Sequence, residues 1–412
     1  MTNPASDLPP APAPEAADAA VPQTPASARV LRPLFLGTGS EYFGIWIINI
    51  LLIVLTVGLY YPWARVRRLQ FFAGSTELDG YRLSFTAVAK QMLPGFSIAL
   101  IAFFIYTIAE TVSPLLSLLL LALFGLVWPW LMRAALRFRL ARTAWRGLSF
   151  AFAGSVRGAY ASFVPMIVLA AVVAVIGGLA VFAESAELVD SLSFSSGIPG
   201  LMVSTIVILL LALGLGLLFI PWIHCRIKHY QHSHFRFADR QSEFTAGPAR
   251  FYGLYLKSAL VALGALLPYL ALTALVAGVG TLGGGNGEFT SVTVGIVSVL
   301  CAILGWQIVA AYFVSRLHNL VWSHTVGNDF AFAAALRFWP FLWLRLVNLI
   351  LKIVTLGLFI PYAQVAIARM KIESIALAVS VDLDALIAQA QQGRVSAGAD
   401  AAADLFDMDL GL

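Results

Sequence analysis

Long apolar runs, separated by short charged connections, are the feature that most limits how this chain can fold. Eight runs in the 412-residue sequence approach or exceed the ~20 residues that a helix needs to cross the hydrocarbon core of a bilayer. Only 11% of the residues are charged, whereas soluble domains have roughly a quarter. The sequence therefore predicts an all-α polytopic membrane protein with about eight apolar helices, over residues 42–61, 92–108, 115–132, 163–182, 201–222, 254–279, 292–314 and 341–362.

The two ends of the chain differ in composition from this apolar centre. Residues 1–30 are rich in Ala and Pro, have no basic residue before Arg29, and lack the features of a signal peptide, so we expect a disordered tail. Residues 376–412 carry scattered aspartates among small residues and predict an acidic, flexible tail. The membrane domain is therefore expected over residues 31–375.

The connections between the apolar runs alternate in charge. Those after the first, third, fifth and seventh runs are basic, whereas the others contain acids such as Glu110 and Glu288 and no Lys or Arg. By the positive-inside rule the basic loops are cytoplasmic, where they can contact anionic lipid of the bilayer. Nucleic acid is not expected as a partner, because no basic surface lies apart from the membrane segments.

Two stretches near the ends of the membrane domain repeat each other. The same six residue types recur at identical spacing, in Asn49, Thr56, Gly58, Pro62, Ala64 and Val66 and again in Asn348, Thr355, Gly357, Pro361, Ala363 and Val365. Such internal repeats usually reflect duplicated helical units. Five short pieces between helix pairs are also alike and typical of strands, around Phe35, Phe85, Phe152, Phe244 and Phe332. We expect them to pair into a small cytoplasmic sheet, because pairing satisfies their backbone groups.

The first of these stretches also carries a family resemblance. The runs Glu41-Tyr-Phe-Gly-Ile-Trp-Ile-Ile-Asn49 and Thr56-Val-Gly-Leu-Tyr-Tyr-Pro-Trp-Ala-Arg-Val-Arg67 resemble the signature of the YjgN-like family of uncharacterised bacterial inner-membrane proteins. The similarity extends roughly over residues 35–371 and spares both tails. It implies a bacterial inner-membrane location and a multi-span helical fold, and it implies no activity.

The first and last apolar runs pose a problem of parity. By their repeats Phe35 and Pro62 both belong on the cytoplasmic side, yet they are only 27 residues apart, too few for two crossings. Either the two runs cross once each, with both termini outside, or they lie along or dip into the inner face. The first run is apolar all round, which favours crossing, so we expect eight crossings.

The last apolar run carries a polar stripe. Arg345, Asn348, Lys352 and Thr355 follow one another at i, i+3, i+7 and i+10, on one face of a helix. A cation inside the membrane usually faces a bundle interior or a watery pathway, so this stripe is a candidate substrate site for an anion. Asn49 and Thr56, at the equivalent repeat positions, are candidates for a second half-site. The alternatives are snorkelling of the basic side chains and polar packing between helices.

Two further sets of residues have recognisable chemistry. Cys225, His229 and His232 lie at i, i+4 and i+7 on one helical face, where a thiolate and two imidazoles would suit zinc or copper, although interfacial histidines are common without metal. Proline and aromatic residues followed by arginine mark the membrane interface. These anchors are Pro62, Trp63, Arg67, Trp130, Pro221, Trp222, Pro361 and Tyr362.

The sequence contains none of the constellations that enzymes use, so we expect neither catalysis nor a cofactor. Two functions remain. In the first, the protein is a transporter or channel for a small, anionic solute or a lipid. In the alternative, it is a membrane scaffold or envelope-maintenance protein that recruits a partner through its cytoplasmic basic loops.

Overall fold

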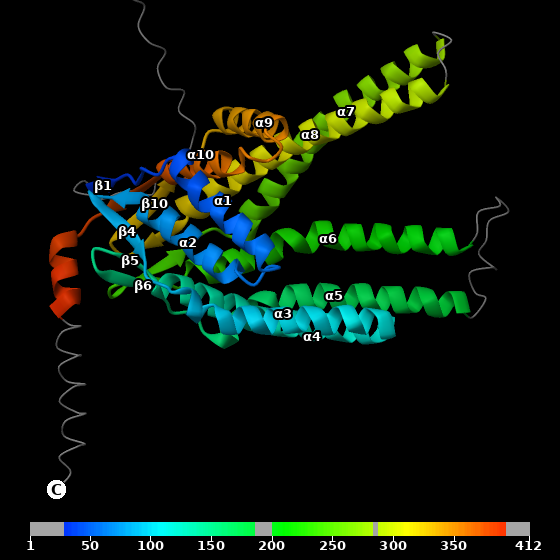
Figure 1. Cartoon of the computed structure of the whole chain (residues 1–412). Coiled ribbons are helices and arrows are strands. Elements are labelled where there is room, and N and C mark those ends of the chain that lie inside the picture. The colour runs from blue at the N-terminus through cyan, green and yellow to red at the C-terminus, as the bar shows by residue number, and fades with distance from the viewer. Residues whose placement is uncertain (1–28, 186–199, 283–286, 393–412) are drawn as a thin grey trace, which may run out of the picture.

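Helical hairpins alternate along the chain with pairs of short strands. The structure, a computed structural model, describes residues 29–185, 200–282 and 287–392 (Figure 1). The strands gather at one end of the molecule, and the long helices project away from them (Figure 1). The helices are α1 (Gly39–Leu55), α2 (Tyr61–Gly74), α3 (Leu93–Val112), α4 (Pro114–Ala141), α5 (Val156–Ser185), α6 (Gly200–His232), α7 (Pro248–Leu282), α8 (Gly287–Ser323), α9 (Phe338–Val354) and α10 (Ile360–Glu373), and residues 383–392 form one more.

Eleven strands form one antiparallel sheet, so the predicted all-α class is wrong. The order across the sheet is β1-β11-β10-β9-β8-β7-β6-β5-β4-β3-β2. The five phenylalanine pieces do lie in this sheet, in β2, β4, β6, β8 and β10, but six further strands complete it. The strands are β1 (Arg29–Leu31), β2 (Leu34–Phe35), β3 (Thr76–Leu78), β4 (Tyr81–Phe85), β5 (Thr143–Trp145), β6 (Leu148–Phe152), β7 (Phe235–Phe237), β8 (Arg240–Phe244), β9 (Thr325–Gly327), β10 (Phe330–Ala334) and β11 (Ile375–Val379).

Tight hairpins build the sheet, and each hairpin pairs with the next. Asp79 and Gly80 join β3 to β4 with positive φ angles at both residues, the type I′ geometry whose twist matches that of paired strands. Within β4, Arg82 pairs with β3, whereas Leu83 to Phe85 pair with β5. One strand therefore links two successive hairpins, and this division repeats along the sheet.

The sheet curls so that its two edge strands lie close together, although they do not pair with each other. Its edge strands β1 and β2 are consecutive in the chain and are separated only by Arg32 and Pro33. A flat sheet of this size would be roughly 48 Å wide at the usual spacing of ~4.8 Å. The three Cα–Cα steps from Leu31 to Leu34 span at most about 11 Å. The sheet also joins the two ends of the membrane domain, because β1 at its start pairs with β11 at its end.

Loops between strands and helices are tied to the helix that precedes each hairpin. The Nε2 atom of Gln70 donates to the carbonyl of Ala87 at 3.2 Å. The Asn319 side chain donates through Nδ2 to the carbonyl of Leu336 and accepts through Oδ1 from the N–H of the same residue. Arg369, on α10, donates to the carbonyl of Gly37 near the start of the described chain. A contact of the same kind thus joins α10 to the segment before α1, near the two ends of the membrane domain.

The short helices α1 and α9 are not among the stretches long enough to span a bilayer, and the prediction of eight spanning helices is wrong. Within the described residues, four helical stretches are long and apolar enough to span a bilayer: Leu93–Val112, Leu119–Ala141, Pro248–Gly280 and Gly287–Ser323. Helix α1 lies between β2 and α2, which returns to β3, and β2 pairs with β3. Helices α9 and α10 likewise connect β10 to β11, which also pair. Each short hairpin therefore begins and ends at the sheet.

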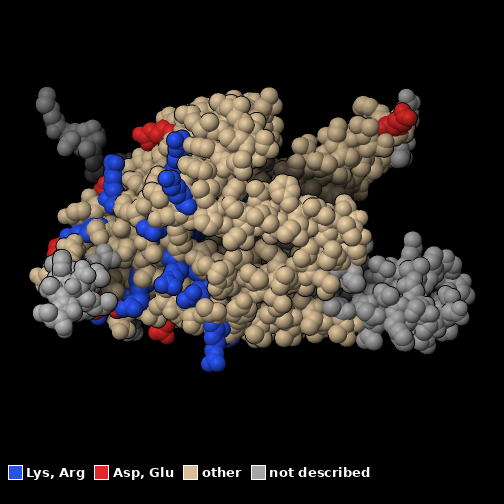
Figure 2. Space-filling model, turned by 60° about the horizontal axis from the view of Figure 1, so that its bottom comes forward, with Lys and Arg blue, Asp and Glu red and all other residues tan. Residues whose placement is uncertain are grey.

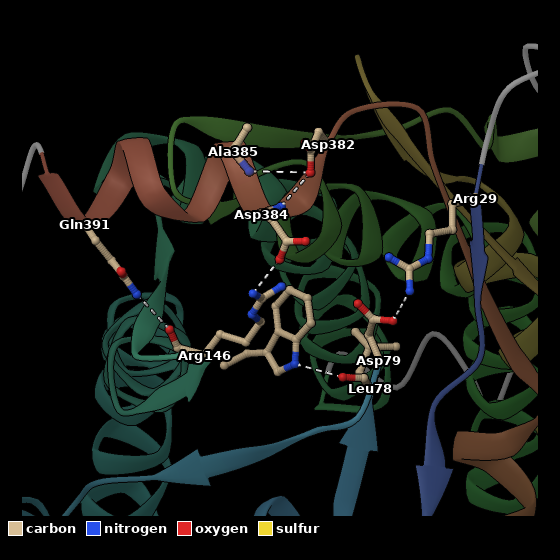
Figure 3. Close-up of polar contacts among 9 residues, drawn as sticks. Arg29, Leu78, Asp79, Arg146, Asp382, Asp384, Ala385 and Gln391 are labelled. Atoms are coloured by element: carbon tan, nitrogen blue, oxygen red, sulfur yellow. Dashed lines mark hydrogen bonds and ion pairs between the residues drawn. The ribbon is translucent and has the colours of Figure 1, made fainter.

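The helix over residues 383–392 covers the end of the sheet opposite the long helices (Figure 1). Ile387 packs in a cluster with Trp145 and Leu148. Arg146 pairs with Asp384, and its carbonyl accepts a hydrogen bond from Gln391, as Figure 3 shows. Residues 376–392 belong to the range expected to be a flexible tail, whereas here they complete β11 and form this helix. Arg29 and Val30 of the first expected tail lie in β1, whereas residues 1–28 and 393–412 lie outside the described residues.

Candidate anion-binding site

A basic collar surrounds the junction between helices and sheet. It consists of cations on the parts of α2, α4, α6, α8 and α10 that lead into strands. Figure 2 shows Lys and Arg gathered in a belt between the strand end and the apolar helices. The collar residues are Arg65, Arg67, Arg68, Arg133, Arg137, Arg139, Arg226, Lys228, Arg316, Arg369 and Lys371.

The collar cations have no carboxylate partners in the described parts of the chain. All ion pairs found there lie at the strand turns, where the acceptors are Asp79, Asp239, Asp329 and, on the helix over residues 383–392, Asp384. Figure 3 shows two of these pairs. Acidic partners are thus concentrated at the far end of the sheet, and the collar keeps an uncompensated positive charge, which attracts anions.

Two cations lie near one another where α9 packs against α8 and α10. Arg345 of α9 donates to Oε1 of Gln307 on α8 through Nε (3.1 Å) and Nη2 (2.8 Å). Its guanidinium carbon is 5.9 Å from the centre of the Phe341 ring. The Lys371 Nζ atom, from α10, is also 5.9 Å from that centre. The two charges therefore flank one fully buried aromatic ring.

The electrostatics of this pair favour a bound anion. Burial lowers the pKa of Lys371, and the nearby Arg345 lowers that pKa further. Burial also lowers the pKa of Arg345. Both shifts mean that the charged forms are destabilised here. An anion between the two side chains would supply the missing counter-charge, and the planar guanidinium suits phosphate or carboxylate.

Two of the six predicted substrate residues, Arg345 and Asn348, lie one turn apart on α9 near Lys371. Asn348 lies one turn after Arg345 on α9, is only 3% exposed, and leaves its Nδ2 atom without a hydrogen-bond partner. Lys352 lies one further turn along, partly exposed, near the end of the helix. Asn49 is also buried with an unpartnered Oδ1 atom, but it lies on α1, which packs mainly on α10 and α2. The structure therefore does not assemble the two predicted half-sites into one site.

Thr355 and Thr56 have structural partners instead. The Thr56 hydroxyl donates to the carbonyl of Leu52 at 2.7 Å and accepts from the backbone N–H of Tyr60 at 3.0 Å. Thr355 makes the same two bonds, to Leu351 and Phe359. Each threonine thus fixes the turn between two helices.

The predicted metal ligands point to different neighbours. Cys225 and His229 line a groove of about 510 Å³ between α5, α6 and the start of α7. The Cys225 Sγ atom is 3.7 Å from the carbonyl of Ala246, whereas Nδ1 of His232 lies 3.1 Å from the Thr325 hydroxyl. No group of three His, Cys, Asp or Glu side chains that could hold a metal occurs within the described residues.

The predicted interface anchors divide into buried and exposed groups. Pro62, Pro221 and Pro361 are fully buried, and the first and last of these open α2 and α10. Trp63 and Trp130 are exposed, whereas Trp222 and Tyr362 are partly buried. Arg67 lies over the ring of Tyr60 at 5.7 Å.

Sequence reasoning missed Gln307, which accepts from Arg345, and Lys371, which lies near it. Gln307 is a polar residue inside an expected span, a signal that by itself indicates a functional position. Lys371 gives no such signal, because its relation to Arg345 depends on how α9 packs against α10. His318 of α8 also faces this end of α10, with Nε2 3.0 Å from the hydroxyl of Ser374.

Comparison with known proteins identifies the family. A family model described as a bacterial protein of unknown function (DUF898) matches residues 31–405. The inner membrane protein YjgN of Escherichia coli O157:H7 is 28% identical over 254 residues, which cover 59% of this chain and 58% of the relative. YjgN of Escherichia coli K12 is 29% identical over 179 residues, or 42% of this chain and 43% of the relative. No solved structure matches. The predicted resemblance is confirmed, and the chain belongs to the DUF898 family of YjgN-like bacterial inner-membrane proteins.

Proposed function

We propose that this inner-membrane protein is a transporter that binds the phosphate or carboxylate group of a small solute or lipid between Arg345 and Lys371. The observation that carries the proposal is the pair itself: two part-buried cations, 5.9 Å from the same ring, with no carboxylate partner in the described residues. Part-buried cations without a counter-charge are costly, and a residue whose pKa is perturbed in this way is a candidate for a functional site.

The proposed orientation places the sheet and the basic collar in the cytoplasm. Hairpins α3–α4 and α7–α8 contain the four stretches that meet the length and hydropathy of a span. Helix α5, of 30 residues, lies beside α4, and α6, of 33 residues, packs on α5 (Figure 1); we propose that α5 and α6 form a third spanning hairpin. The acidic residue Glu288 lies at the far end of α8, so the charge distribution agrees with the positive-inside rule.

A groove of about 460 Å³ opens between α9 and α10 and is lined by the apolar Leu344 and Met370, by Arg337 and Arg369, and by the acidic Glu373. Neither Arg345 nor Lys371 lines this groove, so the proposed anion site rests on the pair alone.

Binding is tested by native mass spectrometry of the protein released from nanodiscs of phosphatidylglycerol and phosphatidylethanolamine. We expect the native protein to retain phosphatidylglycerol selectively, and Arg345→Gln and Lys371→Gln to lose it. Arg236→Gln, at an exposed arginine of β7, is the matched control and should retain it. Equal retention by all four proteins would contradict the proposed site.

Transport is tested separately in proteoliposomes containing fluorescent phosphatidylglycerol or a small organic anion. The native protein should accelerate movement of one of these probes, and Arg345→Gln should abolish the acceleration. Retention of the lipid without accelerated movement of either probe would overturn the transport function and leave the binding site standing.

A further inference from the structure

The two short helical hairpins, α1–α2 and α9–α10, end in apolar tips that no part of the described chain covers. Val57 is 92% exposed and Leu356 is 94% exposed. Val54, Leu55 and Leu59 are also exposed around the first tip, and Ile353, Val354 and Leu358 around the second. Continuous apolar surfaces of this kind are rare in contact with water and indicate a membrane or a protein partner.

The backbone of both tips suits lipid. The N–H groups of Thr56 through Tyr61 all find acceptors within the hairpin: Gly58 donates to the carbonyl of Ile53 at 2.7 Å, and Tyr60 donates to the Thr56 hydroxyl. The six N–H groups from Thr355 to Ile360 are satisfied in the same way. A turn in water does not need such completeness, because water serves its free groups. In hydrocarbon every backbone N–H must have a partner inside the protein.

The lengths of the hairpins fit one leaflet. Helix α1 has 17 residues and is about 26 Å long, less than the ~30 Å core of a bilayer. Arg65 lies one helical turn into α2, so a guanidinium at the headgroups would place Val57 about 10 Å into the hydrocarbon. The middle of the core is about 15 Å deep. The tip therefore ends within the leaflet on the side of the sheet.

The two hairpins lie next to each other. Helix α1 packs on α10, and the Tyr42 hydroxyl donates to Oε1 of Gln364 at 3.2 Å. The two tips differ in one charge, because α9 carries Lys352 one turn before Leu356. The long side chain of Lys352 can extend toward the basic collar and place its amine at the lipid headgroups. Helix α9 packs on α8, and Tyr61 of α2 stacks on Phe96 of α3, so the two short hairpins lie between the spanning hairpins α7–α8 and α3–α4.

We infer that α1–α2 and α9–α10 insert into the cytoplasmic leaflet, contact its acyl chains through Val57 and Leu356, and turn back without crossing. The protein thereby displaces lipid from one leaflet more than from the other. This inference rests on the hairpins alone and does not require the anion site.

Site-directed spin labelling tests the depth of the tips. Val57→Cys and Leu356→Cys, each made with Cys225→Ser and Cys301→Ser, are labelled in phosphatidylethanolamine and phosphatidylglycerol bilayers. We expect high accessibility to oxygen and low accessibility to a water-soluble nickel chelate, at a depth of about 10 Å. Tyr81→Cys, at an exposed strand turn, is the water-accessible control. High accessibility of both tip labels to nickel would overturn the inference.

A membrane-impermeant thiol reagent distinguishes insertion from crossing. Added to the outer face of intact inner-membrane spheroplasts, it should leave Val57→Cys and Leu356→Cys unmodified. Phe289→Cys, at the far end of α8, should react from that side and thus also report the orientation. Modification of either tip from outside would show a crossing and overturn the inference.

Discussion

The helix over residues 383–392 should be held to the sheet by apolar packing and hardly at all by its ion pair. Ile387 is 4% exposed and packs on Trp145 and Leu148, so Ile387→Ala should cost ~2–5 kcal/mol, the usual range for this truncation in a packed site. Asp384 is 72% exposed, and a pair with such a partner contributes at most about 1 kcal/mol. Ile387→Ala should therefore release the helix and Asp384→Asn should not.

Amide hydrogen exchange measures this difference directly. At about 1.4 kcal/mol per tenfold, Ile387→Ala should speed exchange of the amides in residues 383–392 by about 30-fold or more. Asp384→Asn should change it by no more than about fivefold, and amides of β5 should be unaffected in both. Equal exchange rates in the two variants, or loss of protection in Asp384→Asn alone, would refute the reasoning.

Three other predictions follow from the same structure. Gly58→Ala should lower the free energy of unfolding by about 1–2 kcal/mol, because Gly58 has φ +89°, a conformation that is strained for alanine. No atom lies within 4 Å of an added Cβ, so the cost comes from the backbone and not from a clash. Gly44→Ala, in ordinary helix with the same open space, is the control, and equal melting temperatures of the two variants would contradict the prediction. Anion binding should weaken from pH 7 to about pH 10, because Lys371 has a pKa below 10.5 and loses its charge as the pH rises, beside Arg345 and His318. Lys371→Arg keeps its charge over this pH range and should bind the anion equally well throughout. If binding by this variant still weakens as the pH rises, a group other than Lys371 is responsible. The purified protein should carry no stoichiometric zinc by elemental analysis, since His232 and Cys225 have other partners. One zinc per chain that is lost in Cys225→Ser would contradict this prediction and support a metal site at these residues.

Local features of the fold were predictable, whereas its closure was not. Phe85 and Phe152 could be placed in strands because each ends a short piece after a basic helix. The pairing of Arg29 with Val379 joins residues far apart in the sequence, and no local pattern predicts it. The run over residues 42–61 was interpreted as one span from its hydropathy. Thr56-Val-Gly58 within it is a helix-ending signal, because a residue with positive φ after a helix is usually glycine.

The residues of the candidate site divide in the same way, into those that a local pattern predicts and those that depend on packing between helices. Arg345 and Asn348 were found because their spacing places them on one face of one helix. Lys371 could not be found, since its proximity to Arg345 depends on packing between α9 and α10. Thr56 and Thr355 were interpreted as ligands because they recur with the asparagines, but the recurrence reflects the turn that each hydroxyl stabilises.

The central claim is that Arg345 and Lys371 together hold an anionic group, and a structure of the protein in phosphatidylglycerol nanodiscs tests it most directly. We predict density for a phosphate within about 4 Å of both the Arg345 guanidinium and the Lys371 amine, absent in the Arg345→Gln variant. A carboxylate of the protein itself bound to the pair, or only water between the two side chains, would contradict the claim.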